Sequence, residues 1–424
     1  MSYSSLFIRP ARNYKIIDGI RAVAIIWVLI LHVMFFHQTL LPDTTKLVYS
    51  EFWLRWIATG TLGVDLFFVI SGFLIGTILL KEFKRTSKIN FKNFYIRRFL
   101  RLIPAYTFAM ILGAFFLRSS GLDTWEQSWS NFLYINNYIP GSYMPWTWSL
   151  AIEEQFYIIA PFLLAFILPL FKRKYVFFLI LAVIPIVLSY HYVVNIHQFQ
   201  VPLKADYPDE NWLNWFWNYY MLTHLRYGGL LSGVVAAYLH VNKKEEIQRF
   251  FENSRKLNAG LIILALAVFF SFSFILIGPG GEPQDSVFSN LPQSYGIWYE
   301  VLYRDVFSYA VAFIILACIY STSRLIQPVK SFLSLKLFYP IAQLSYSAYL
   351  FHEMFMLWFY PMGVEYFKGL GYGEVLIIFI NGLISIVVIL IVAMLMYVYI
   401  EQPFQRMRTK LTRPTEKEMA KLKI

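Results

Sequence analysis

The chain has 424 residues, of which 58% are hydrophobic and 15% are charged, and its formal net charge is +12. Soluble proteins average about 25% charged residues, so this composition excludes a soluble globular enzyme and indicates a protein that crosses a membrane many times. We attribute the positive charge to membrane topology and to contact with anionic lipids, and we expect no nucleic-acid partner. The lone Cys318 excludes an intrachain disulfide and a metal site built from cysteines.

The sequence predicts an all-α polytopic membrane protein, a single bundle of about ten transmembrane helices. Apolar stretches of sufficient length lie near residues 16–38, 55–80, 95–117, 148–171, 174–194, 214–240, 257–278, 299–320, 338–360 and 373–400. The stretch at 214–240 fits least well, because its first half is aromatic and polar. We expect a transmembrane domain over 16–401, with an N-terminal tail (1–15) and a basic C-terminal tail (402–424) on either side of it.

The basic residues are distributed unevenly over the predicted loops. Of the 37 lysines and arginines, 29 fall in the two tails and in the loops after the even-numbered helices. The remaining loops are acidic or carry few charges, as in residues 206–210 and 282–285. Because loops rich in Lys and Arg stay in the cytoplasm, we expect both termini to be cytoplasmic.

Arg21 and His32 share the first apolar stretch. Eleven residues at about 100° each bring both side chains to one face of a helix, roughly 16 Å apart along its axis. Ionisable groups inside a membrane are costly and mark functional sites by default. Each also has a simpler reading: Arg21 could extend its guanidinium to the interface, and His32 could be a polar contact between helices.

Two adjacent carboxylates, Glu153 and Glu154, follow Trp148 near the start of the fourth predicted helix. Neighbouring residues on a helix point about 100° apart, so only one of the two is expected to face a given site. Glu153 could orient an imidazole or act as a base itself. The simpler reading is stabilisation of the helix N-terminus, which suits Glu154 better.

Further ionisable residues lie in or beside apolar stretches. Arg98 and Arg101 are three residues apart, so both guanidinium groups lie on one helix face, where they suit a phosphate clamp or ordinary interfacial anchoring. Asp65 and Arg226 are further ionisable residues that we expect to be buried without an obvious local partner, and His352 is a second imidazole inside an apolar stretch. No cluster of His, Asp and Glu shows the spacing of a metal site, and no glycine-rich phosphate loop occurs.

The predicted extracytoplasmic loops at 125–148 and 212–220 are rich in tryptophan and tyrosine. They suit an interfacial aromatic belt, or a platform that stacks on sugar rings while Asn131, Asn136 and Asn137 bond to sugar hydroxyls.

Six segments, in order, resemble the membrane-bound acyltransferase-3 family, whose bacterial members O-acylate cell-surface glycans. These are Ile17–Arg21 with the ten-residue spacing to His32, Gly63–Leu74, Arg98-x-x-Arg101, Trp148–Tyr157, Ser345–His352 and Ile400–Phe404. The resemblance covers about residues 14–404, with Ala22 where the family usually has glycine.

The resemblance implies a multi-pass protein of the bacterial inner membrane that takes acyl-CoA, most often acetyl-CoA, as donor and a cell-surface or lipid-linked glycan as acceptor. We expect no permanently bound cofactor and no metal. Carried over to this sequence, the expected catalytic residues are His32 and Glu153, the acyl-CoA-binding residues are Arg21, Arg98, Arg101 and Asp18, and the supporting residues are Asp65, Glu154, Arg226 and His352.

The mechanism and the acceptor stay open from the sequence alone. His32 would take a proton from the attacking hydroxyl or carry the acyl group as a transient acyl-imidazole. The acceptor could instead be a small lipophilic metabolite such as a macrolide. A non-enzymatic transporter or flippase would also need buried charges, but the chain shows no inverted repeat of the transporter kind.

Overall fold

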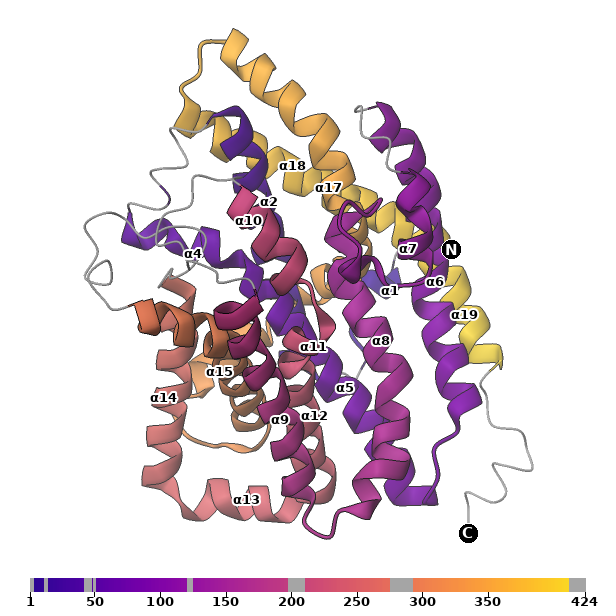
Figure 1. The fold of residues 1–424 in the computed structure, drawn as a ribbon, viewed down its shortest axis with the longest axis vertical. Helices are drawn as coiled ribbons and strands as arrows, with labels where there is room; N and C mark the ends of the chain where they lie inside the picture. The colour runs from indigo at the N-terminus through magenta and orange to yellow at the C-terminus, as the bar shows by residue number, and fades with distance from the viewer. Residues whose placement is uncertain are drawn as a thin grey trace.

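The computed structural model describes residues 4–10, 14–41, 48, 51–119, 125–196, 210–274 and 293–411, and every regular element in these ranges is helical. Figure 1 shows the helices as one bundle. The long helices are α2 (Lys15–Leu40), α5 (Leu62–Thr86), α6 (Phe91–Ser119), α8 (Trp148–Phe162), α9 (Lys174–His191), α12 (Gly228–Asn242), α14 (Arg255–Phe274), α15 (Gln293–Tyr320), α17 (Phe338–Gly369) and α18 (Glu374–Met396).

Within the described ranges, eight helical segments are long and apolar enough to cross a membrane. The predicted count of ten is therefore not confirmed. The two long helices outside this set are α12, which has 15 residues, and α17, which has 32.

The stretch predicted as one helix over 214–240 is broken into several pieces. After α10 (Glu210–Trp215) come a single π-helical turn (Phe216–Tyr220), the short α11 (Thr223–Arg226) and then α12. The backbone is extended at Leu222, with φ −74° and ψ 124°. The aromatic and polar first half of this stretch thus forms turns, and only the glycine- and alanine-rich second half forms a regular helix.

Several helix ends also differ from the prediction. The second helix begins at Leu62 after short turns over Phe52–Thr61, not near residue 55. The last helix continues from α18 through a π turn (Tyr397–Glu401) into α19 (Gln402–Leu411), which packs against α6. The predicted boundary between transmembrane domain and C-terminal tail, at residues 401 and 402, therefore falls inside a continuous helix.

Helices α5 and α12 approach each other closely at two glycines. A Cβ on Gly72 would overlap the backbone carbonyl of Leu230, and a Cβ on Gly233 would overlap that of Val69. Small residues let helix backbones come together where lipid provides no hydrophobic drive for association. This crossing fixes α5, which carries much of the site described below.

Helix α2 packs against both α5 and α17. At its start, Gly19 sits directly on the backbone of Leu333, the last residue of α16 (Gln327–Leu333). Arg9, from the preceding segment, donates to the carbonyl oxygens of Ser334 and Leu335, each at 3.1 Å. These contacts anchor the start of α2 and bring its length alongside α17.

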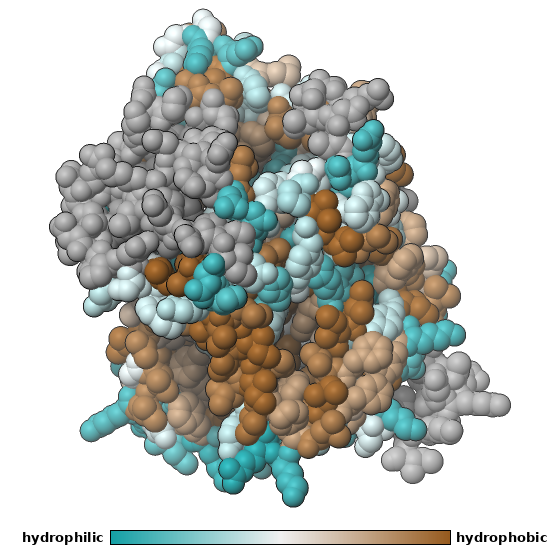
Figure 2. All heavy atoms as spheres, in the orientation of Figure 1, coloured by the Kyte–Doolittle hydropathy of each residue, from teal (hydrophilic) through white to brown (hydrophobic). Residues whose placement is uncertain are grey.

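The surface has an apolar region bordered by charge. Figure 2 shows brown hydrophobic side chains over the lower half of the molecule, above a rim of teal hydrophilic ones. Exposed apolar residues such as Val187, Leu264 and Leu383 belong to the candidate spanning helices, as expected for lipid contact. The turn after α5, the turn after α8 and the helix α13 (Lys244–Asn253) lie together at the lower end in Figure 1. We call this end the basic face, because these segments and the helix ends beside them carry Lys84, Arg85, Lys88, Lys172, Arg173, Lys174, Lys244 and Arg249.

Candidate active site

A pocket of about 280 Å³ lies between α2, α5, α6, α8 and α17. Arg21, Arg98 and Arg101 line it, so three arginines from two separate sequence motifs meet in one cavity. Apolar side chains of α5 form one wall: Val64, Phe67, Phe68, Ile70, Leu74, Ile75 and Ile78. Ser149 and Tyr349 also line the pocket.

The guanidinium groups are held by neighbouring side chains of the pocket. Arg21 donates from Nη2 to the hydroxyl of Ser345 on α17, at 3.1 Å. Arg98 lies over the ring of Tyr157, 5.5 Å from its centroid, and its Nε is buried without a hydrogen-bond partner among the described residues. Guanidinium groups fixed in this way retain donor atoms for an anionic ligand.

Glu153 faces this pocket and does not contact His32. Its Oε1 accepts a hydrogen bond from Ser71 at 3.0 Å, and its Oε2 accepts one from Tyr157 at 2.6 Å. The predicted role of Glu153 in orienting the imidazole therefore has no contact to support it. The adjacent Glu154 does not line the pocket, in keeping with the angle between neighbouring helix positions.

The carboxylate that contacts His32 is Glu353, on α17. The Nε2 atom of His32 lies 3.1 Å from Oε1 of Glu353, and the two side chains are 20% and 17% exposed. The other ring nitrogen, Nδ1, lies 2.8 Å from the carbonyl oxygen of Val28, one turn earlier in α2. A carbonyl can only accept, so Nδ1 carries a hydrogen, and the 3.1 Å contact of Nε2 with the carboxyl group requires a second hydrogen, on Nε2 or on Oε1.

His352 lies directly against His32, with ring centroids 4.4 Å apart and the rings nearly perpendicular. Its Nδ1 donates to the carbonyl oxygen of Tyr349 at 2.6 Å. In the neutral ring Nε2 is then the acceptor nitrogen, and it is buried without a hydrogen-bond partner among the described residues.

Tyr349 connects the arginine-lined pocket to the histidines. Its hydroxyl donates to the carbonyl oxygen of Trp146 at 2.6 Å and accepts a hydrogen bond from Ser149 at 2.6 Å. Its ring packs against His352, with centroids 5.3 Å apart. From the pocket, the order is thus Tyr349, then His352, then His32 with Glu353.

His32, His352 and Glu353 also form a group that could hold a metal ion, because one ligand atom from each lies within 4.8 Å of the other two. No such group was predicted from the sequence. Its members come from two helices far apart in the chain, so their spacing could not reveal it.

Asp65 and Arg226, predicted as buried ionisable residues without partners, pair with each other. Asp65 lies 3.2 Å from Nη2 of Arg226 and 3.0 Å from Nη1 of Arg304, which comes from α15. Both guanidinium groups stack on Tyr220, 4.7 and 4.6 Å from its ring centroid. Asp65 and Arg226 thus belong to an ionic network that ties α5, α11 and α15 together.

Asp18, predicted to help bind acyl-CoA, does not line the pocket. Its carboxylate lies 3.1 Å from Nε of Arg9, and so it holds the N-terminal segment onto the bundle. The three asparagines considered as sugar-binding groups are fully buried. Asn131, Asn136 and Asn137 bond to protein groups such as the hydroxyls of Thr147 and Thr223.

Sequence reasoning missed Glu353 and Tyr349, although both lie in or beside a segment it singled out. Glu353 directly follows His352, and Tyr349 stands three residues before it. A local signal existed, therefore, but the choice of carboxylate depends on how α17 packs on α2.

Comparisons with known proteins give a family match over most of the chain. An acyltransferase domain model, that of acyltransferase family 3, matches residues 14–398. The O-acetyltransferase OatA of Staphylococcus aureus (strain NCTC 8325 / PS 47) is 28% identical over 411 residues, which is 92% of this chain and 57% of that protein. OatA of strain COL gives the same values.

A further protein of S. aureus strain COL, with a provisional O-acetyltransferase name, is 37% identical over 175 residues. That match covers 38% of this chain and 26% of the relative. This chain thus spans between about a quarter and somewhat more than half of these relatives' lengths. No solved structure gives a significant match. With the family model matching from residue 14 to residue 398, the chain belongs to the acyltransferase-3 family.

Proposed function

We propose that the protein is an integral membrane O-acyltransferase that transfers an acyl group, with acetyl as the preferred group, from acyl-CoA to a hydroxyl of a cell-surface or lipid-linked glycan. Family membership and relatives named as O-acetyltransferases support the reaction class. The helical bundle with its apolar surface supports a multi-pass membrane location, which we take to be the bacterial inner membrane.

One observation carries the proposal: Tyr349, in the wall of the arginine-lined pocket, packs on His352, which packs on the paired imidazole and carboxylate of His32 and Glu353. CoA carries several phosphate oxygens, which guanidinium groups bind through charge-assisted hydrogen bonds. Arg21, Arg98 and Arg101 would hold this anionic end. The apolar wall of α5 would cover the uncharged arm that ends in the thioester.

His32 has the geometry of a general base. Its Nδ1–H is bound to Val28, so Nε2 is the nitrogen that takes the proton of the acceptor hydroxyl, which must enter where Nε2 now faces Glu353. The hydroxyl oxygen forms a bond to the thioester carbonyl carbon, the carbon–sulfur bond breaks, and CoA leaves as the thiolate. Glu353, 3.1 Å from Nε2, stabilises the imidazolium that forms, and the imidazolium then supplies a proton to the leaving group.

The same arrangement suggests a direction of transfer. The excess of Lys and Arg on the basic face predicts that this face is cytoplasmic, where CoA is found. Arg98 and Arg101 lie near the start of α6, which begins at the basic face, whereas His32 lies in the second half of α2. The acyl group would thus move from the basic face into the bundle, toward an acceptor at the opposite side of the membrane.

Membrane vesicles of defined orientation test this proposal. Acetyl-CoA does not cross membranes. Acetyl-CoA labelled in its acetyl group is added to inside-out and right-side-out vesicles that contain the protein. We expect alkali-labile label in the polysaccharide fraction only when the donor reaches the cytoplasmic face. Label that appears only in small, solvent-extractable products would favour a lipophilic metabolite as the acceptor. If no label is transferred and an unmodified glycan crosses the membrane, the protein would be a flippase.

A further inference from the structure

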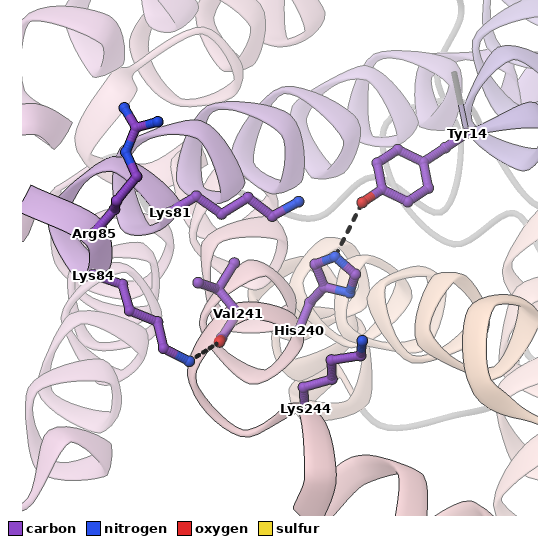
Figure 3. A pocket seen from close by; sticks show the side chains of 7 residues that line it. All are labelled: Tyr14, Lys81, Lys84, Arg85, His240, Val241 and Lys244. Carbon is purple, nitrogen blue, oxygen red and sulfur yellow. Dashed lines mark hydrogen bonds between the residues drawn. The ribbon is translucent and has the colours of Figure 1, made fainter. Parts of the chain in front are cut away.

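A second pocket, of about 440 Å³, opens where α5, α12 and α13 meet. It shares no lining residue with the arginine-lined pocket of the candidate active site. Figure 3 shows its lining side chains, which are Tyr14, Lys81, Lys84, Arg85, His240, Val241 and Lys244. Four of these seven residues are cationic and none is acidic.

His240 forms an ordered polar wall of this pocket. Its Nε2 lies 3.0 Å from the hydroxyl of Tyr14, and its Nδ1 lies 2.8 Å from that of Tyr320 on α15. A neutral imidazole has one N–H, so one tyrosine donates to the ring and the other accepts from it. When Nε2 carries the hydrogen, the Tyr14 hydroxyl accepts from it and can donate its own hydrogen into the pocket.

The cations are arranged around this wall, not spread singly over the surface. Lys84 donates to the carbonyl oxygen of Val241 at 2.9 Å, which fixes the end of α12 against α5. Lys81 and Lys244 end on either side of His240 (Figure 3). Among the described residues, no carboxylate forms an ion pair with Lys81, Arg85 or Lys244. The neighbouring Lys243, by contrast, pairs with Glu246 at 2.6 Å.

We propose that this pocket binds a phosphate group. Four like charges around one cavity repel each other, and an anion with several acceptor oxygens relieves that repulsion while it accepts from lysine, arginine and tyrosine donors. Retention of positive loops in the cytoplasm explains the presence of these cations, but it does not require a hollow with a fixed imidazole–tyrosine wall. The phosphate could belong to an anionic phospholipid headgroup or to a soluble phosphate, since both present the same oxygens.

Binding to the purified full-length protein in a zwitterionic detergent tests the assignment. The probes are inorganic phosphate at constant ionic strength and mixed micelles containing phosphatidylglycerol, with phosphatidylcholine micelles as reference. The Lys81→Gln/Lys244→Gln double variant removes two pocket charges, and both positions are exposed, so the fold should be kept. Lys243→Gln, an adjacent cation outside the pocket, is the matched control, and Tyr14→Phe removes only the hydroxyl.

We expect the double variant to bind its probe at least tenfold more weakly, because it loses two charged donors and a single charged hydrogen bond of about 1.5 kcal/mol already corresponds to about tenfold. The control should stay within about twofold of wild type, and Tyr14→Phe should weaken binding by a smaller factor. An effect confined to phosphatidylglycerol identifies a lipid headgroup, and an effect on inorganic phosphate identifies a soluble ligand. Binding that is absent in wild type, or equal in the double variant and the control, would overturn the proposal.

Discussion

Replacing Glu353 by glutamine removes the negative charge next to Nε2 of His32 and leaves the side chain almost unchanged in size. Two unit charges 3.1 Å apart interact by about 5 kcal/mol at the effective dielectric constant of about 20 that suits protein sites. Both side chains are about a fifth exposed, which screens part of this energy, and the amide of glutamine retains a hydrogen-bonding group. We therefore expect a loss of roughly 3 kcal/mol in stabilisation of the imidazolium.

A loss of this size lowers kcat by about two powers of ten. The assay is acetyl transfer from labelled acetyl-CoA by purified, reconstituted protein, with kcat and the donor KM measured separately. The donor KM should change little, because Glu353 does not line the pocket of the three arginines. Glu365→Gln, an exposed position on the same helix, is the control for the loss of a carboxylate from α17. A folded Glu353→Gln protein with kcat within about threefold of wild type would refute the pairing argument, and Glu153 would then become the leading carboxylate.

Further predictions concern the donor, the packing of the bundle and metals. Arg98→Ala or Arg101→Ala should raise the donor KM several-fold or more, with a smaller effect on kcat. Lys88→Ala, outside the pocket, should leave the donor KM unchanged. Equal effects of all three substitutions would indicate an effect of diffuse surface charge. Gly72→Ala should cost about 1–3 kcal/mol of stability, seen as a lower Tm in detergent, because its Cβ would overlap a backbone carbonyl. Gly260→Ala, where a Cβ meets open space, should leave Tm equal or slightly higher. Exhaustive chelation should leave transfer intact if the imidazole acts as a base; activity lost to chelation and restored by zinc would show that the two histidines and their carboxylate hold a metal.

The sequence alone located most long helices, because an apolar run of about 20 residues has few alternatives to a membrane helix. It also placed Arg21 and His32 on one face of the same helix, since that relation depends only on helical periodicity. The meeting of Arg98 and Arg101 with Arg21 followed from family motifs and not from periodicity.

What the sequence could not provide was contact between helices distant along the chain. The choice of Glu353 over Glu153 depends on the packing of α17 against α2, and the pairing of Asp65 with Arg304 depends on the position of α15. Asp18 was predicted to bind acyl-CoA because it lies in the first family motif. In the structure it forms an ion pair with Arg9, a residue of the N-terminal tail that the sequence indicated only as basic. The break in the helix before α12 was not predicted either, because the mean hydropathy of residues 214–240 combines a part that forms turns with a part that forms a helix.

The central claim is that the imidazole of His32 acts as the base when an acyl group passes from acyl-CoA to a hydroxyl acceptor. The most direct measurement compares wild type with His32→Ala in envelope fractions supplied with labelled acetyl-CoA, with O-ester label detected by mass spectrometry and protein amount checked in the membrane. We expect labelled polysaccharide from wild type and a loss of at least 10²–10⁴-fold in the variant, the typical contribution of a general base. Labelling at a near-wild-type rate by a correctly inserted His32→Ala protein would contradict the account.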